Sequence, residues 1–340
     1  MKDNITKLRE VQLDLLRAFS SVCKEHDLRY YAFFGTLLGI MRGEGYLPWD
    51  DDVDIAMPME DYAKLCGNPD WFDKKKYTLQ TPISCGNPAF AKLRKNGTTA
   101  FRADFITELK AGGHHGICID IIPLSDIPGM DSYNTPTVSS PNKKDKVYLK
   151  DWFEPAGTGI FEGLELRIPA KSRKVLTESY ETWAWPAGAR ECCPTYWFFD
   201  TEKGYDDYVR RFTGMIPAME GKKVFLFGAA DSLRIWLERF DKKQDVICTF
   251  DNDPGKWGSL SYGVEVKNPE ELPGLLKKEK DSIVIIVSLW HLDIGRQLES
   301  MGINDYYIYL DDYYDEKIGN KVVRREDLPR GDKTIPHWDA

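Results

Sequence analysis

Apolar and polar positions follow distinct periods along the chain, and these periods predict most of its elements. Near the start, apolar residues recur at three- and four-residue steps, which predicts an amphipathic helix over residues 3–27 with Lys7 and Arg9 on its wet face. Thr36 is expected to cap a helical turn over residues 36–42. Further apolar or alternating runs predict strands at 28–34, 52–57, 77–80, 90–93 and 116–122, and a helix at 59–66.

The pattern loosens between residues 129 and 220 and then changes character. We interpret 129–220 as a lid or extension of the first domain, because it shows no core period of its own. From residue 222, β-branched strands alternate with helices, and strands are predicted at 223–227, 246–250, 282–287 and 306–310. This alternation is typical of a parallel sheet covered by helices. We therefore expect an α/β protein with domains at 1–220 and 221–315 and a polar tail at 316–340.

The turn after the first strand of the second domain resembles a dinucleotide-binding turn. Gly228 follows the strand, but Ala230 and Leu233 stand at the second and third glycine positions of G-x-G-x-x-G. Asp251 lies at the end of the next strand, where such domains place a ribose-binding acid. The incomplete motif predicts a Rossmann-like domain, for which docking, dimerisation or acceptor binding is favoured over cofactor binding.

Composition and charge exclude several classes of protein. The 340 residues carry 46 Lys and Arg against 54 Asp and Glu, and this net charge of −8 disfavours a nucleic-acid binder. No run approaches the roughly 18 apolar residues that span a bilayer, and charges interrupt the apolar pattern of the N-terminus, unlike a signal peptide. Seven cysteines without a C-x-x-C spacing predict a reduced, cytoplasmic protein. Peripheral contact with a membrane and homo-oligomerisation are left open.

Carboxylates carry the strongest chemical signal. Four aspartates stand within five residues, at positions 50, 51, 52 and 54. Asp52 and Asp54 flank Val53 on a predicted strand, so we expect both side chains on one face. Two such carboxylates need a cation, and hard oxygen ligands select Mg²⁺ or Mn²⁺. The alternative is a solvated acidic loop, but Asp54, like Asp120 in a later strand, lies within apolar sequence, where an unpaired charge is costly.

Three basic residues are candidate phosphate ligands. Lys92 and Arg94 alternate with apolar residues on a strand and so share a face, while Arg42 leaves the helical turn near the acidic run. Gly35 and Thr36 open that turn, where backbone N–H groups can hold a phosphate. The alternative for each cation is a surface charge or an ion pair with the aspartates.

The order of these features resembles the nucleotidyltransferase superfamily. More closely, it is similar to the LicD family of phosphocholine transferases, which includes the fukutin and fukutin-related proteins. The resemblance covers about residues 5–215 and rests on GTLLG at 35–39, Arg42, Gly45, PWDDDVD at 48–54, FAKLR at 90–94 and DIIPL at 120–124. FEG at 161–163 with Pro169 also matches, whereas YETW at 180–183 has Glu181 in place of the glycine usual in the family.

The resemblance implies an α+β nucleotidyltransferase-like domain with a mixed sheet, and a Mg²⁺-dependent transfer. A phospho-alcohol, with phosphocholine favoured, would move from a CDP-linked donor to a hydroxyl of a glycan or lipid-linked glycan, such as a teichoic acid or lipopolysaccharide. Asp52, Asp54 and Asp120 are then the catalytic and metal-binding residues, and Asp120 completes the metal shell or takes the proton of the acceptor. The substrate-binding residues are then Gly35, Thr36, Arg42, Trp49, Asp50, Asp51, Lys92 and Arg94.

A choline group would need aromatic faces around its quaternary ammonium. The candidates are Trp49, Trp152, Trp183, Trp185, Trp197 and Phe198, with core filling or acceptor stacking as the alternative for each. Two other functions stay open from the sequence: a nucleotidyltransferase that moves NMP to a small molecule, and a non-catalytic scaffold that binds a nucleotide.

Overall fold

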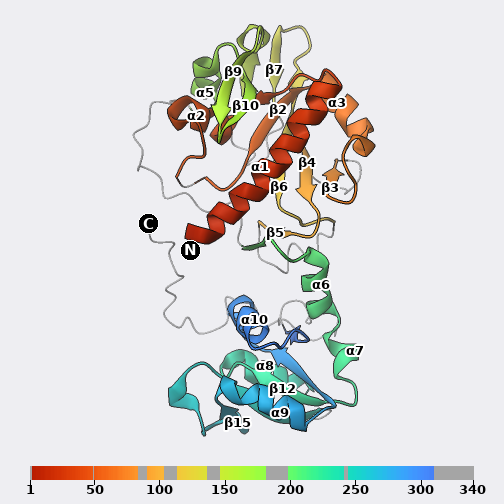
Figure 1. Cartoon of the computed structure of the whole chain (residues 1–340), viewed down its shortest axis with the longest axis vertical. Coiled ribbons are helices and arrows are strands. Elements are labelled where there is room, and N and C mark those ends of the chain that lie inside the picture. Colours follow the sequence, from red (N-terminus) through yellow and green to blue (C-terminus); the bar gives the residue numbers. More distant parts are fainter. Residues whose placement is uncertain are drawn as a thin grey trace. The chain divides into compact units, whose positions relative to one another are not determined.

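The structure, a computed structural model, describes residues 2–48, 50–82, 90–102, 113–135, 146–180, 198–240 and 244–309. The chain divides into two compact units, Met1–Asp206 and Asp207–Ala340 (Figure 1). The sequence pattern places this division near residue 220. It falls earlier because Arg211 of α6 (Tyr205–Thr213) is buried in the second unit, where it donates to the carbonyl oxygens of Asn304 and Tyr306 at 3.0 and 3.1 Å. The predicted tail at 316–340 lies outside the described residues.

A seven-stranded mixed sheet forms the centre of the first unit. Its order is β1-β2-β6-β4-β3, and β7 and β8 extend it from β6. Strands β2 and β6 run parallel, and the remaining pairs are antiparallel. The strands are β1 (Tyr31–Ala32), β2 (Asp54–Pro58), β3 (Tyr77–Gln80), β4 (Ala91–Lys95), β6 (Cys118–Asp126), β7 (Ser132–Asn134) and β8 (Val147–Leu149). This arrangement confirms the predicted mixed sheet.

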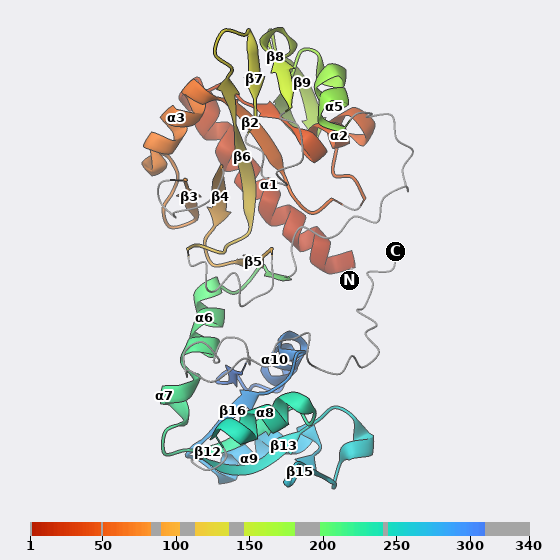
Figure 2. The same cartoon turned by 180° about the vertical axis from the view of Figure 1, so that it is seen from behind.

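Helix α1 (Lys2–Glu25) lies across one face of this sheet (Figures 1 and 2). Its Leu8, Leu15 and Phe19 are fully buried, as their spacing predicts. The prediction that Arg9 lies on the wet face is wrong, because its guanidinium instead donates to main-chain oxygens between residues 47 and 50.

The contact between α1 and β4 shows which face of the sheet the helix covers. Lys95 of β4 approaches Asp14 of α1 at 2.7 Å. Successive strand residues point to opposite faces, so Lys92 and Arg94 point away from α1. The other helices described in the first unit are α2 (Phe34–Gly43), α3 (Met59–Gly67) and α5 (Ser172–Tyr180).

The stretch predicted as an extension, 129–220, contributes to both units. Strands β9 (Gly157–Phe161) and β10 (Leu164–Ile168) form a hairpin, and β11 (Phe198–Asp200) pairs with β5 (Thr99–Phe101) in the first unit. Residues 136–145 and 181–197 of this stretch lie outside the described residues.

A six-stranded sheet in the order β14-β15-β13-β12-β16-β17 forms the second unit. All pairs are parallel except β14–β15, which confirms the predicted parallel sheet. The strands are β12 (Lys223–Phe227), β13 (Asp245–Phe250), β14 (Leu260–Ser261), β15 (Val264–Lys267), β16 (Ser282–Ile286) and β17 (Tyr307–Ile308). The helices are α7 (Met215–Met219), α8 (Asp231–Phe240), α9 (Leu272–Lys278) and α10 (His291–Ser300).

The turn between β12 and α8 requires glycine at its first position. Gly228 has a φ of +128°, and a Cβ there would lie 2.4 Å from the carbonyl oxygen of Val287. The carboxylate of Asp251 accepts a hydrogen bond from the amide of Ala229 at 3.1 Å, so it holds this turn in place. Across the described ranges, no helix has the length and apolar character needed to cross a bilayer.

Candidate active site

A row of polar side chains crosses the first sheet on the face away from α1. Asp54 of β2 lies in register with Asp120 of β6, and Asp120 lies in register with Lys92 of β4. Gln80 of β3 continues the row beside Lys92. Residues in register on neighbouring strands point to the same face, with their Cβ atoms close together. The sheet therefore brings together charged residues that lie far apart in the sequence.

Both carboxylate oxygens of Asp120 contact cations. Oδ1 lies 2.7 Å from Nζ of Lys92, and Oδ2 lies 2.9 Å from Nη2 of Arg102. Burial by itself raises the pKa of Asp120, but the charges of Arg102 and Lys92 outweigh it and hold that pKa below its usual value. Asp120 is therefore ionised at neutral pH. Arg102 is not predicted from the sequence, because nothing in the pattern around it indicates a contact with Asp120.

The aspartate run enters the sheet later than predicted. Strand β2 begins at Asp54, so the prediction that Asp52 shares this strand is wrong. A turn closed by the amide of Asp50 on the carbonyl oxygen of Leu47, at 3.0 Å, precedes the strand. The amide of Asp120 then donates to the carbonyl oxygen of Val53 at 2.9 Å, so the chain joins the edge of β6 only after Asp52.

Neighbouring carboxyl groups of this run raise one another's pKa values. Burial, and then the neighbouring Asp52, raise the pKa of Asp50 to about 8, and the two side chains share a hydrogen bond. Burial, and then Asp52 and Asp120, raise the pKa of Asp54 well above its usual value. Carboxyl groups with raised pKa values at one place favour either protons or a bound cation.

The donor set fits a magnesium ion that is shared with a substrate. Within the described ranges, no three His, Cys, Asp or Glu side chains form a ready-made metal cage. Mg²⁺ is usually bound by one or two carboxylates and completes its shell with water and substrate phosphates. Asp50, Asp52 and Asp54 supply such oxygens, whereas both oxygens of Asp120 already contact cations.

Gly35 and Thr36 position the aspartates directly. Helix α2 begins at Phe34, so the prediction of Thr36 as its N-cap is wrong. The Thr36 hydroxyl instead accepts a hydrogen bond from the amide of Asp54 at 2.9 Å. A Cβ on Gly35 would lie 2.7 Å from Oδ2 of Asp50, so only glycine leaves room for that carboxylate. The phosphate contacts expected of these two residues stay a prediction.

The candidate phosphate ligands have different surroundings. Arg94 is buried, and it donates from Nη1 to the carbonyl oxygen of Gly116 at 2.7 Å and from Nε to Gln80. Arg42 lies in the last turn of α2 and is half-buried. Lys92, in contrast, contacts Asp120 directly. Phosphate binding by Arg42 and Arg94 stays a prediction, and Trp49 lies outside the described residues.

An aromatic pair stands beside the aspartates. Burial, and then Asp54, Asp50 and Asp52, raise the pKa of Tyr180 at the end of α5. The ring of Tyr180 packs edge-on against Phe34, with 6.3 Å between centroids. Phe34 has a φ of +37°, a left-handed conformation that is strained for a bulky residue and is found at functional sites.

The aromatic residues proposed from the sequence for choline lie elsewhere or are not described. Phe198 stacks on Phe101 with 6.2 Å between centroids, and Trp152 lies 5.9 Å from Nζ of Lys174. Four of the proposed residues lie outside the described residues: Trp49, Trp183, Trp185 and Trp197.

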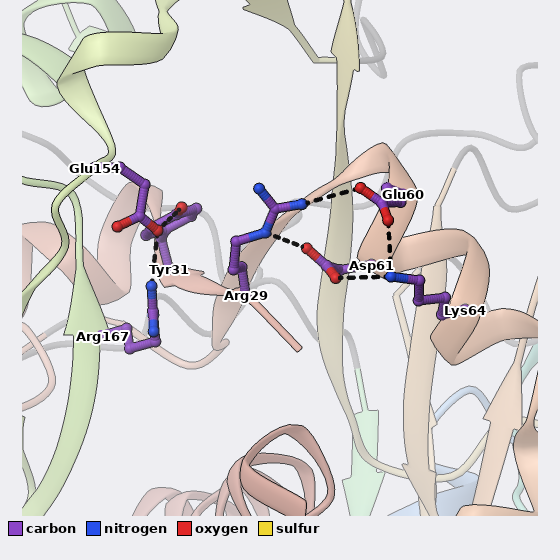
Figure 3. Close-up of polar contacts among 7 residues, drawn as sticks. All are labelled: Arg29, Tyr31, Glu60, Asp61, Lys64, Glu154 and Arg167. Carbon is purple, nitrogen blue, oxygen red and sulfur yellow. Dashed lines mark hydrogen bonds and ion pairs between the residues drawn. The ribbon is translucent and has the colours of Figure 1, made fainter. Parts of the chain in front are cut away.

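A second polar cluster shows what a charge-balanced site looks like in the same unit (Figure 3). Asp61 of α3 is buried, but its Oδ2 lies 2.6 Å from Nε of Arg29, and its Oδ1 lies 3.9 Å from Nζ of Lys64. Glu154 lies 2.7 Å from both the Tyr31 hydroxyl and Nη2 of Arg167. Each carboxylate here faces a cation, so this cluster stabilises the fold and leaves no surplus charge for a metal ion.

Part of the chain is similar to a known protein family. Residues 27–171 match the model of the LicD/FKTN/FKRP nucleotidyltransferase domain family. A lipopolysaccharide cholinephosphotransferase LicD of Haemophilus influenzae is 34% identical over 79 residues, which are 22% of this chain and 29% of that protein. An uncharacterised protein of Rickettsia prowazekii is 32% identical over 65 residues, which are 19% of this chain and 24% of that protein. The chain thus spans less than a third of the length of these two relatives.

Solved structures resemble the chain only weakly. A UDP-D-quinovosamine 4-dehydrogenase from Vibrio fischeri is 25% identical and covers 32% of this chain and 97% of its own, with a TM-score of 0.24. A Rex-family repressor is 13% identical and covers 45% of this chain and 74% of its own, also with a TM-score of 0.24. Likenesses of this size say nothing about the function of the chain.

Proposed function

Because residues 27–171 match the LicD-family nucleotidyltransferase domain, we propose that this protein is a phosphotransferase. It would move a phospho-alcohol, with phosphocholine favoured, from a CDP-linked donor to a glycan hydroxyl and release CMP. The observation that carries the proposal is the row of Asp54, Asp120 and Lys92 across three strands of that domain. Phosphoryl transfer depends mainly on positioning and on cations around the phosphates, and Lys92 of this row would supply one such cation.

Asp52 and Asp54 are the proposed ligands of Mg²⁺, with Mn²⁺ as a substitute. When bound, the ion neutralises charge on the pyrophosphate of the donor and on the departing CMP. The raised pKa of Asp54 supports this assignment, because a cation there would relieve the repulsion from Asp52 and Asp120. Asp50, which is hydrogen-bonded to Asp52, stands beside this pair.

Asp120 and its two partners have a different proposed role. Lys92 and Arg102 both pair with Asp120, which lies in register with Asp54, and we propose that they also contact the phosphates of the donor. Asp120, held by these cations at 2.7 and 2.9 Å, is the proposed acceptor of the proton from the attacking hydroxyl. An ionised aspartate serves this purpose in phosphoryl transfer, where the nucleophile needs orientation more than strong activation.

Phe34 and Tyr180 support choline as the alcohol. A quaternary ammonium cannot donate hydrogen bonds and is held over aromatic faces. These two rings lie together next to the aspartates, and so they could hold the choline end of a donor whose phosphates face the metal. The Haemophilus relative is named for transfer of phosphocholine to lipopolysaccharide, so we propose a cell-surface glycan or its lipid-linked precursor as the acceptor, modified in the cytoplasm.

The test is release of CMP from purified protein. CDP-choline, CDP-ethanolamine, CDP-glycerol and CDP-ribitol are compared with Mg²⁺ and then with EDTA, with and without a lipopolysaccharide acceptor. We expect Mg²⁺-dependent CMP, fastest from CDP-choline, and loss of at least about 100-fold in Asp52→Asn, since that variant removes a proposed metal ligand. Asp70→Asn is the matched control, because the Asp70 side chain is 73% exposed and pairs only with Lys74 among the contacts described.

Two results would contradict the proposal. Equal turnover of every CDP-alcohol by wild type and Asp52→Asn would remove the metal assignment. Release of pyrophosphate from CTP, with no CMP from any CDP-alcohol, would instead show that the chain transfers a nucleotidyl group.

A further inference from the structure

Helix α1 reaches the aspartate run through one arginine. Nη2 of Arg9 donates to the carbonyl oxygens of Leu47, Pro48 and Asp50 at 2.9, 3.2 and 2.6 Å, and Nε donates to that of Asp50 at 3.1 Å. All four bonds end on main-chain oxygens. A planar guanidinium makes several such bonds from one rigid fork, which an ammonium cannot do.

Gln12, one helical turn further along α1, also binds the main chain of the aspartate run. Its side chain is fully buried, and its amide nitrogen donates to the carbonyl oxygen of Asp51 at 2.8 Å. Its amide oxygen accepts a hydrogen bond from the Tyr46 hydroxyl at 3.0 Å. The Tyr46 ring lies 4.7 Å from the guanidinium carbon of Arg9, and its amide donates to Glu162 at 3.0 Å.

The two α1 side chains therefore fix the main chain on the side of the aspartates that faces the helix. Four carbonyl oxygens between Leu47 and Asp51 are bound by Arg9 or Gln12. The side chain of Asp50 lies close to Gly35, where a Cβ would come within 2.7 Å of Oδ2. With the main chain held by α1 and the Asp50 carboxylate confined by Gly35, the directions in which Asp50 and Asp52 project are set before any ligand arrives.

We propose that Arg9 and Gln12 are positioning residues that preorganise Asp50 and Asp52 for a divalent cation. The inference rests on the proposed function, and it adds that α1, which precedes the residues 27–171 matched by the family model, positions the proposed metal ligands. Partners that orient metal ligands typically change metal affinity or activity 10- to 100-fold when they are replaced. Neither residue touches the metal or the substrate in this account; both act through the main chain.

The test measures metal binding and turnover separately on the full chain. Mn²⁺ binding is followed by electron paramagnetic resonance, with and without CMP, for wild type, Arg9→Lys and Gln12→Glu, because the proposed ion also draws ligands from substrate phosphates. Arg9→Lys keeps the positive charge but removes the planar guanidinium that donates to several carbonyl oxygens. Gln12→Glu replaces the amide group that donates to the carbonyl oxygen of Asp51 with a carboxylate, which can only accept. Arg17→Lys is the matched control, because Arg17 lies exposed on the same helix. Thermal midpoints are recorded for each variant, and KM for CDP-choline and kcat are measured at saturating Mg²⁺.

We expect Arg9→Lys and Gln12→Glu to weaken Mn²⁺ binding by about 10-fold or more and to lower kcat, with KM close to wild type. The thermal midpoint should stay close to wild type in Arg9→Lys and fall in Gln12→Glu, because the Gln12 side chain is fully buried and a carboxylate there would face the carbonyl oxygen of Asp51 without a proton to donate. Mn²⁺ affinity equal to wild type in both variants, or a loss that only follows a lower thermal midpoint, would overturn the inference and leave the proposed function intact. A wild-type chain that binds no Mn²⁺ would overturn the proposed metal function itself and this inference with it. If Gln12→Glu fails to fold, Arg9→Lys decides the question, because it keeps the charge at a half-buried position.

Discussion

Two lysines of strand β4 form ion pairs with the same N–O distance but different burial. The two pairs can therefore be compared to separate the effect of burial from that of distance. Lys92 and Asp120 are 2.7 Å apart, with side chains 11% and 4% exposed. Lys95 and Asp14 are also 2.7 Å apart, with side chains 26% and 42% exposed. If burial rather than contact distance decides the strength of an ion pair, the two aspartates should respond very differently to replacement by asparagine.

The structure sets the expected magnitudes. Asp120→Asn leaves the buried Lys92 without a carboxylate and removes a partner from Arg102, and breaking one side of a buried pair costs roughly 3–5 kcal/mol. Asp14→Asn breaks a pair that water already screens, which costs about 1 kcal/mol or less. The folded-state pKa of Asp120 is lowered, so its contribution is present above its unfolded value of 3.8 and is lost as pH falls through the folded pKa.

Urea unfolding at pH 7 measures both effects. Circular dichroism follows unfolding in wild type and in two double-mutant cycles. One cycle combines Asp120→Asn with Lys92→Met, and the other combines Asp14→Asn with Lys95→Met. The coupling energy of the buried pair should exceed that of the half-exposed pair by about 1–2 kcal/mol. Equal coupling in the two cycles would refute the reasoning that the surroundings of Asp120 make it a strongly held anion.

Three further changes test the account at other points. Gly35→Ala should displace the Asp50 side chain, because the added Cβ would lie 2.7 Å from Oδ2. We expect calorimetry to show about 10-fold weaker Mn²⁺ binding, and unchanged binding would contradict the role of Gly35 in placing Asp50. Tyr31→Phe removes the 2.7 Å hydrogen bond to Glu154 away from the aspartates, so unfolding free energy should fall by about 1.5–3 kcal/mol while CMP release per folded molecule stays at the wild-type rate. Burial and Asp52 raise the folded pKa of Asp50 from 3.8 to about 8, so the native state binds the extra proton. The unfolding free energy of the metal-free protein should therefore fall as pH rises from about 4 to 8, and saturating Mg²⁺ should flatten that fall; a rise with pH, measured by urea titration, would show the sign to be wrong.

Regular elements were the most predictable part of this protein. The three- and four-residue period of Leu8, Leu15 and Phe19 predicts α1, and those residues are fully buried in it. The β-branched runs of the second unit predict a parallel sheet, which the strand pairing confirms. These features are local, because each depends on a period that is complete within one segment of the chain.

The site was predictable only in part, because its geometry is made by contacts between distant segments. A D-x-D pattern marks Asp52 and Asp54, but the period of a strand does not reveal that β2 begins only at Asp54. Thr36 has the chemistry of a helix cap, yet its hydroxyl binds the amide of Asp54, 18 residues further along. Arg102 gives no signal in the sequence, since its role depends on Asp120, which lies 18 residues further along in β6.

The central claim is that the phosphorus atom carrying the alcohol is attacked, and labelling with ¹⁸O tests it directly. The protein is incubated with CDP-choline and Mg²⁺ in H₂¹⁸O without acceptor, so that water takes the place of the glycan hydroxyl, and both products are analysed by mass spectrometry. We predict ¹⁸O in phosphocholine and unlabelled CMP, because water then attacks the phosphorus that carries choline. Label in CMP would mean attack on the nucleotidyl phosphorus and would contradict the account.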